Sequence, residues 1–161
     1  MSENSLSLLQ ILTVLLLLSF CGCSEQDPDG NGDQKNFSTS SLYDNKMLQY
    51  FADNHPGQTI LKYAQADLDD DGREDLIVIY NVEKSKNQMC VIHYNGEDLT
   101  ATNSVPAPVS DQLITFRDID EKPPLEFIVQ GRKGAKVGYA IFRIEEGILA
   151  DLFGEGMEDC C

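Results

Sequence analysis

The sequence predicts a mainly β protein, built from two blade-like antiparallel repeats of about 51 residues with one N-terminal helix. Three observations carry this prediction. Short apolar runs rich in β-branched residues, such as LIVIY and CVIHY, are bounded by polar turn residues. An acidic loop, DLDDDGRED, lies between two such runs, and the same order of runs and loop recurs farther along the chain.

The repeat is found by shifting the sequence by 51 residues, and no gap is needed. The aligned pairs include Asp67 with Asp118, Asp75 with Glu126, and Gly96 with Gly147. The copies span about residues 58–108 and 109–159 of a β-rich domain at 41–159. Two copies are too few for a closed propeller, which has about four or more blades. We expect a compact antiparallel fold of two blade-like sheets, or an incomplete pair of blades packed face to face.

One helix is predicted from Ser41 to Asn54, with Ser40 or Ser41 as its N-cap. Apolar residues fall near one stripe of this segment, and His55-Pro56-Gly57 should end it. We expect the helix to cover one sheet. Its stripe consists of Leu42, Met47, Tyr50 and Phe51.

The first acidic loop has the ligand spacing of a calcium site. Acidic residues occupy positions one, three, five and nine, and Gly72 at position six permits a sharp turn. The predicted ligands are Asp67, Asp69, Asp71, Asp75 and the backbone carbonyl of Arg73. An EF-hand needs Glu at position twelve, where this chain has Val78 within an apolar run. The alternative is an acidic β-turn without a metal.

The loop, flanked by strand-like runs, resembles the DxDxDGxxD loops of FG-GAP and VCBS-type β repeats. That resemblance implies a structural Ca²⁺ that neutralises four carboxylates. In the second copy, Lys122, Pro123 and Pro124 replace Asp71, Gly72 and Arg73. A lysine in place of a ligand argues against a second calcium, so this loop is interpreted as a rigid turn.

The N-terminal segment predicts a lipoprotein signal at residues 1–22, because the apolar run from Leu6 to Phe20 has the length of a signal h-region. Phe20-Cys21-Gly22-Cys23 resembles the bacterial lipobox, with Cys23 as the lipidated residue. The alternative is an uncleaved N-terminal anchor. Residues 23–40 are polar and predict a flexible tether. We therefore expect a lipid-anchored, extracytoplasmic protein attached to the cell membrane.

The net charge of −15 argues against nucleic-acid binding, which depends on Lys and Arg meeting phosphate. Sequence motifs for hydrolases, P-loops, CxxC redox centres and dinucleotide binding are absent from the chain. His55, in a turn, and His93, in an apolar run, are interpreted as structural. No catalytic residues are assigned, and an enzymatic role is less expected than a binding role.

Three cysteines remain beyond the lipobox. Cys90 lies in an apolar run and should be a small buried hydrophobe; the alternative is a partner for the tail. Cys160 and Cys161 end the chain as an adjacent pair of soft donors, which suits a soft metal such as Hg²⁺. A thiol–disulfide couple is the other chemistry open to this pair.

A lipoprotein-type start, an acidic β-rich domain and the terminal Cys160-Cys161 together resemble the bacterial Cys-Cys-COOH (seleno)protein family, SaoC. In some members selenocysteine takes one terminal position, which implies a role for the thiol or selenol itself. The resemblance implies heavy-metal or organometal handling outside the cytoplasm, with a transporter or an organometal-processing protein as partner. The pair is also similar to the vicinal pair of mercuric reductases.

Three functional hypotheses follow. In the first, the protein binds or relays a soft metal or organometal through Cys160 and Cys161, and a calcium-stabilised β domain presents the pair. In the second, the same cysteines form a redox couple. In the third, the protein is an FG-GAP-like surface adhesion or scaffold module, in which the thiols are incidental or form intermolecular disulfides.

Overall fold

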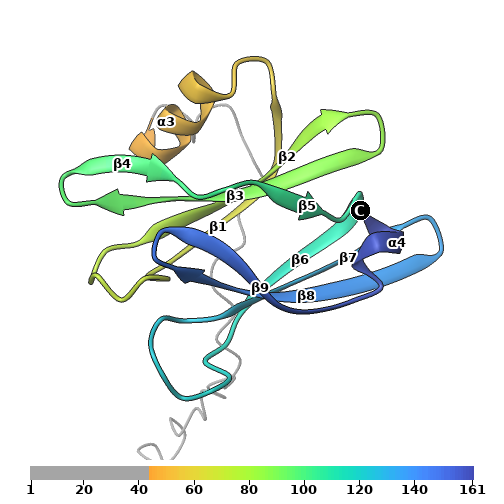
Figure 1. The fold of residues 1–161 in the computed structure, drawn as a ribbon. Coiled ribbons are helices and arrows are strands. Elements are labelled where there is room, and N and C mark those ends of the chain that lie inside the picture. Colours follow the sequence, from red (N-terminus) through yellow and green to blue (C-terminus); the bar gives the residue numbers. More distant parts are fainter. Residues whose placement is uncertain (1–43) are drawn as a thin grey trace, which may run out of the picture.

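The computed structural model describes residues 44–161, in which nine strands form two antiparallel sheets. Sheet A contains β1 (Thr59–Ala66), β2 (Asp75–Glu83), β3 (Lys86–Asn95), β4 (Asp98–Ala101) and β5 (Val105–Ala107). Sheet B contains β6 (Ser110–Phe116), β7 (Phe127–Lys133), β8 (Lys136–Glu145) and β9 (Ile148–Glu155). The sheets form two layers, and α3 (Lys46–Asn54) lies on the outer side of sheet A (Figure 1). The predicted mainly β fold is confirmed.

Strand order follows the chain from β1 to β4 in sheet A and from β6 to β9 in sheet B, because consecutive strands in each run are antiparallel neighbours joined by a turn or a loop. β4 and β5 pair with different halves of β3 and share its edge. The acidic loops β1–β2 and β6–β7 lie at the same end of the molecule, and the β2–β3 and β7–β8 hairpins lie at the opposite end (Figure 1). This arrangement gathers the acidic residues of both repeats at one end.

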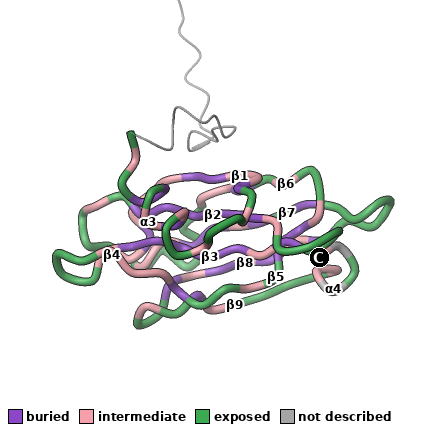
Figure 2. Tube along the Cα trace, turned by 90° about the horizontal axis from the view of Figure 1, so that it is seen from above, coloured by how far each residue is buried: buried purple, intermediate pink, exposed green. Residues whose placement is uncertain are grey.

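Two apolar layers hold the fold together, and the buried positions run along the middle of the strands (Figure 2). The first layer lies between the sheets and includes Ile77, Val91, Phe127 and Phe142. The second lies between sheet A and α3. β2 is buried on both faces for most of its length, which explains its continuous apolar run LIVIY. A four-residue helix, α4 (Met157–Cys160), follows β9.

The two sheets are copies of one another, but the predicted ungapped alignment is wrong beyond the first hairpin. Leu76 pairs with Ile92, and Phe127 pairs with Phe142. The offset is 51 residues from Leu76 to Phe127 and 50 from Ile92 to Phe142. The difference is a bulge in β2 between Asn81 and Glu83, which adds one residue that β7 lacks.

Because of this bulge, Gly96 corresponds to Glu146 and not to Gly147. Both residues follow the second strand of their hairpin, and both have positive φ, 67° and 51°. The prediction from sequence aligned two glycines, although the shared feature is the left-handed turn position.

The helix begins later than predicted. Its N-cap is Asn45, whose side-chain oxygen accepts hydrogen bonds from the backbone amides of Met47 and Leu48 at 2.9 and 3.2 Å. Asn45 therefore supplies the capping that was expected of Ser40 or Ser41. The predicted end is confirmed, with His55 as C-cap and Gly57 at a φ of 82°. Met47, Leu48 and Phe51 form the buried face against sheet A.

The predicted signal segment 1–22, the lipidation site Cys23 and the tether 23–40 lie outside the described residues. Within residues 44–161, no helix has the length and apolar character needed to cross a membrane.

Candidate metal sites

Asp75 anchors the first acidic loop at the start of β2. Its side chain is fully buried, and Oδ2 accepts a hydrogen bond from the Leu68 amide at 2.8 Å. Its other oxygen, Oδ1, is buried and has no hydrogen-bond partner. Burial, together with the nearby carboxylates Asp69, Asp71 and Asp67, raises the pKa of Asp75 to about 7. A buried carboxylate with an unpaired oxygen favours a cation beside it.

Asp67 opens the loop and has a similar arrangement. Its Oδ2 accepts a hydrogen bond from the Gly72 amide at 3.0 Å, and its Oδ1 is also buried without a partner. Carboxylate oxygens of Asp67, Asp69 and Asp71 all lie within 4.8 Å of one another. Gly72, with a φ of 82°, supplies the turn that brings them together. Three of the predicted ligands therefore share one small volume.

The two remaining carboxylates of the cluster meet the side chains of Arg73 and His93. Arg73 donates to Asp71 Oδ2 from Nε at 2.9 Å and from Nη2 at 2.6 Å, and these hydrogen bonds hold the pKa of Asp71 below its usual value. The same guanidinium lies 4.2 Å from the ring centroid of Tyr94 and donates to the Gly96 carbonyl. Asp69 Oδ2 lies 3.3 Å from His93 Nδ1. If a metal ion binds in this loop, it would replace the Arg73 guanidinium as the partner of the Asp71 carboxylate.

The second acidic loop repeats this geometry. The Ile119 amide donates to Glu126 Oε2 at 2.9 Å, just as the Leu68 amide donates to Asp75. Asp118, Asp120 and Glu126 also have carboxylate oxygens within 4.8 Å of one another. The backbone frame of a metal loop is therefore present in both copies.

The difference between the loops is Arg143. Its Nη1 donates to Asp120 Oδ2 at 3.1 Å and to Glu126 Oε1 at 3.0 Å. Glu126 is 1% exposed, so the guanidinium neutralises a buried carboxylate from within the protein. The first loop has no such internal cation on Asp75, whose Oδ1 stays unpaired.

Arg143 and His93 occupy equivalent positions, because residues of β8 lie 50 positions after their equivalents in β3. Their partners on the next strand, Ala150 on β9 and Thr100 on β4, are related by the same offset. The arginine reaches two carboxylates, whereas the shorter histidine reaches Asp69. Sequence reasoning missed both roles because the ungapped alignment places Arg143 opposite Ile92. An alignment with one gap at the hairpin would have paired the two residues.

The oxygen-rich donor set of the first loop fits calcium. Asp67, Asp69 and Asp71 offer carboxylate oxygens within 4.8 Å of one another, whereas Asp75 is not part of that group. Arg73 follows the turn at Gly72 with its carbonyl at position seven. Hard Ca²⁺ takes about six to eight oxygen ligands, and water supplies those the protein lacks. The two buried unpaired oxygens are the structural observation that favours occupancy.

The cysteines are divided between core and surface. Cys90 is 1% exposed and unpaired with another cysteine, and burial raises its pKa to about 12. It lies in the layer under α3, which fits the predicted role as a small buried hydrophobe. The alternative role of Cys90, as a partner for the tail, stays a prediction.

Cys161 lies at the hairpin end of the molecule and lines a surface pocket of about 690 Å³. Its Sγ is 4.0 Å from Met157 Sδ, and Lys133 donates to its backbone oxygen at 3.0 Å. Lys84, Lys86 and Lys133 also line this pocket, which therefore carries three lysines in a strongly acidic chain. The side chain of Cys160 is outside the described part of the structure.

Comparison with known proteins gave no match to a family model, to a curated protein or to a solved structure.

Proposed function

We propose that this protein is a calcium-stabilised β domain whose Asp67–Asp75 loop binds one Ca²⁺. The proposal is supported chiefly by the two buried carboxylate oxygens, Asp67 Oδ1 and Asp75 Oδ1, that have no hydrogen-bond partner. A cation bound in the loop would offset the cost of burying these two oxygens. In the second loop, Arg143 already neutralises the buried Glu126 carboxylate, so the expected stoichiometry is one calcium per chain.

The role of such an ion is structural. The loop connects β1 to β2, and β2 is the central buried strand of sheet A. Repulsion among four carboxylates in a short loop makes an unfavourable contribution to the free energy of folding. Bound Ca²⁺ attracts these carboxylates, so the electrostatic contribution of the loop becomes favourable. Calcium would thereby raise the stability of the whole domain.

Thermal unfolding in calcium or in a chelator tests this function. At a free concentration a hundred-fold above the dissociation constant, Ca²⁺ should stabilise the chain by about 2.7 kcal/mol. Asp67→Asn should abolish the effect, and the matched variant Asp118→Asn in the second loop should retain it. Equal melting in calcium and chelator, together with no heat of binding in calorimetry, would contradict the proposal.

We further propose that this domain presents Cys160 and Cys161 for soft-metal binding, and that the lipobox-like Cys23 anchors it at the extracytoplasmic membrane surface. The supporting observation is the 4.0 Å approach of Cys161 Sγ to Met157 Sδ, which adds a thioether to the thiols. A transporter or organometal-processing protein would then be the partner.

Mercury binding by the reduced chain tests this second function. The double variant Cys160→Ser/Cys161→Ser should lose high-affinity Hg²⁺ binding and keep the calcium-dependent melting of the parent. Cys90→Ala is the matched control, since Cys90 is buried away from solvent. Undiminished Hg²⁺ binding by the double variant would refute a role for the pair.

A further inference from the structure

Arg73 has two roles in the first acidic loop, one for its backbone and one for its side chain. Its carbonyl stands at position seven, where a calcium ligand is expected. Its guanidinium donates to Asp71 Oδ2 at 2.9 and 2.6 Å, and its backbone amide donates to Asp71 Oδ1 at 2.8 Å. Both oxygens of this carboxylate are therefore bonded to Arg73, although Asp71 belongs to the group of three that could hold a metal ion.

The backbone of this loop is held in place by hydrogen bonds of its own. The amide of Asp71 donates to Asp69 Oδ1 at 3.2 Å, and the amide of Gly72 donates to Asp67 Oδ2 at 3.0 Å. These bonds fix the turn without the guanidinium. Exchange of one cation for another at Asp71 then needs a movement of the Arg73 side chain alone.

The guanidinium of Arg73 also has partners outside the loop, at the turn between β3 and β4. Its Nη1 donates to the Gly96 carbonyl at 2.8 Å, and its carbon lies 4.2 Å from the centroid of the Tyr94 ring. The negative charge of Glu97 also acts on it. Arg73 can therefore leave Asp71 and remain bound at this turn.

Exposure distinguishes this arginine from the one in the second loop. The side chains of Arg73 and Asp71 are 39% and 24% exposed. In the second loop, the Glu126 side chain that Arg143 contacts is only 2% exposed. Ion pairs in contact with water are weak, whereas removing one partner of a buried pair is costly. Arg73 is thus displaceable, and Arg143 is not.

Arg73 compensates the first loop only in part. Its guanidinium bonds to Asp71 and Gly96, while Oδ1 of Asp67 and Oδ1 of Asp75 are buried without a partner. A divalent ion in the loop offers these oxygens a cation that the arginine does not supply.

We propose that Arg73 is an internal substitute cation, which sets the calcium affinity of this loop and stabilises it when calcium is scarce. This inference rests on the proposed calcium function. The contact between Arg73 and Asp71 must break before Asp71 can bind the ion, so its free energy is subtracted from that of binding. By linkage, the stability that this contact adds without calcium equals the binding free energy that it removes.

Calorimetric titration of the full chain with Ca²⁺ tests this role. Arg73→Met should bind calcium about five-fold more tightly than the parent, as expected for loss of a partly exposed ion pair. Arg73→Lys keeps the charge but not the forked geometry, so its affinity should lie between the two.

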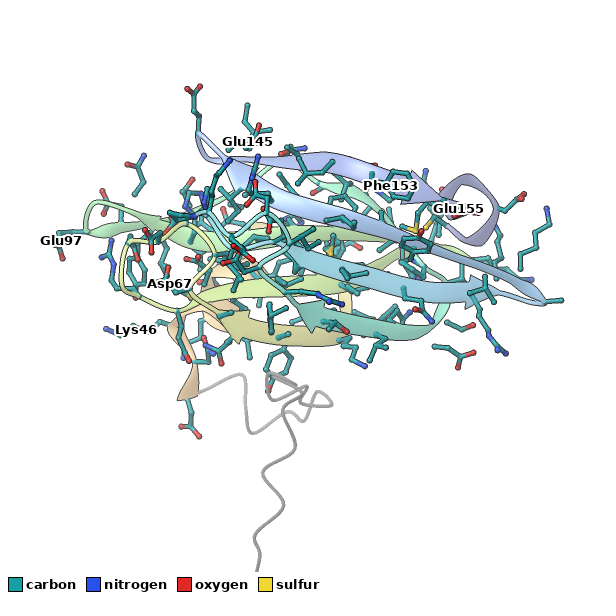
Figure 3. All side chains as sticks on the ribbon, turned by 90° about the horizontal axis from the view of Figure 1, so that it is seen from below. Lys46, Asp67, Glu97, Glu145, Phe153 and Glu155 are labelled. Carbon is teal, nitrogen blue, oxygen red and sulfur yellow. The ribbon has the colours of Figure 1, made fainter. Side chains whose placement is uncertain are left out.

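Lys46→Met is the matched control for charge. Lys46 and Arg73 line the same surface pocket, and Figure 3 shows Lys46 and Asp67 at the same end of the molecule. This variant removes one positive charge near the loop and leaves the contact between Arg73 and Asp71 in place. Its calcium affinity should change less than that of Arg73→Met.

Thermal melting supplies a second measurement. Arg73→Met should melt below the parent in chelator, and the difference should shrink in saturating calcium, where the contact with Asp71 is already broken. A fall of equal size in both conditions would assign Arg73 a purely structural role and would overturn the inference.

The titrations separate this inference from the proposed calcium function. Equal calcium affinity in the parent and Arg73→Met, or an equal gain in Lys46→Met, would overturn the inference and leave the calcium function standing. Binding by Arg73→Met alone would support the inference and contradict calcium binding by the parent. If neither chain binds calcium, both proposals are wrong.

Discussion

Replacing Asp75 with Asn should stabilise the calcium-free protein and abolish its response to calcium. Asp75 is fully buried at the start of β2, with one oxygen bonded to the Leu68 amide and the other unpaired. Asparagine keeps an acceptor for the amide and removes the charge. Its NH₂ group can donate towards the neighbouring carboxylates Asp67 and Asp69, whose charges already act on this position.

The magnitude follows from the pKa of Asp75. Burial raises it from 3.8 to about 7, so folding favours the protonated form. The stability that this group contributes is fully present below pH 3.8 and is lost as pH rises through about 7. The total loss corresponds to about 4 kcal/mol, which sets the upper limit for the gain from Asp75→Asn above neutral pH.

Urea unfolding in chelator between pH 5 and pH 8 measures this effect directly. The parent should lose stability across this range, and the variant should lose much less because its residue 75 does not titrate. Added calcium should restore the parent at pH 8, where the carboxylate is ionised, and leave the variant unchanged.

Glu126→Gln is the matched control in the second loop. It removes the charge that Arg143 pairs with, so it should destabilise the protein with or without calcium and preserve the calcium response of the first loop. If Asp75→Asn lowers stability in chelator at pH 8, or if it retains the calcium response, the reasoning from the unpaired oxygen is wrong.

Two further predictions follow from the second loop and the buried cysteine. Arg143→Met should destabilise the chain by about 3 kcal/mol, because it leaves the buried Glu126 carboxylate uncompensated; urea unfolding measures this, and a loss below experimental error would contradict the pairing. Iodoacetamide at pH 8 should leave Cys90 unmodified in the folded chain and alkylate it in urea, since burial raises its pKa to about 12. Peptide mass spectrometry reports both states, with Cys161, which is partly exposed, as the reactive control; rapid labelling of Cys90 in the native protein would show that its strand opens.

Much of the fold could be predicted from local patterns. Runs such as LIVIY predicted buried strands, and their repetition predicted two sheets. The start of the helix could not be placed in the same way, because serine and asparagine are comparable N-caps and Asn45 competes with Ser40 and Ser41. The bulge at Val82 was also missed, since a single extra residue leaves the apolar pattern on both sides intact.

For the candidate calcium site, the sequence supplied the residues and the structure supplied the reason to distinguish the two loops. The spacing of Asp67, Asp69 and Asp71 is a local property, and a tight turn brings such residues together wherever it occurs. The cation that balances the second loop comes from Arg143, 17 residues after Glu126. Only the register of β7 against β8 places it there.

The sequence by itself determined the strands, the repeat and the acidic ligand set, because each depends on side chains that are near one another in the chain. The tertiary structure decided which carboxylate oxygens lack a partner, since that depends on what the neighbouring strand brings to them. It also decided that α3 covers one face of sheet A and that sheet A covers the equivalent face of sheet B. Those properties arise from packing between the sheets, which no local pattern encodes.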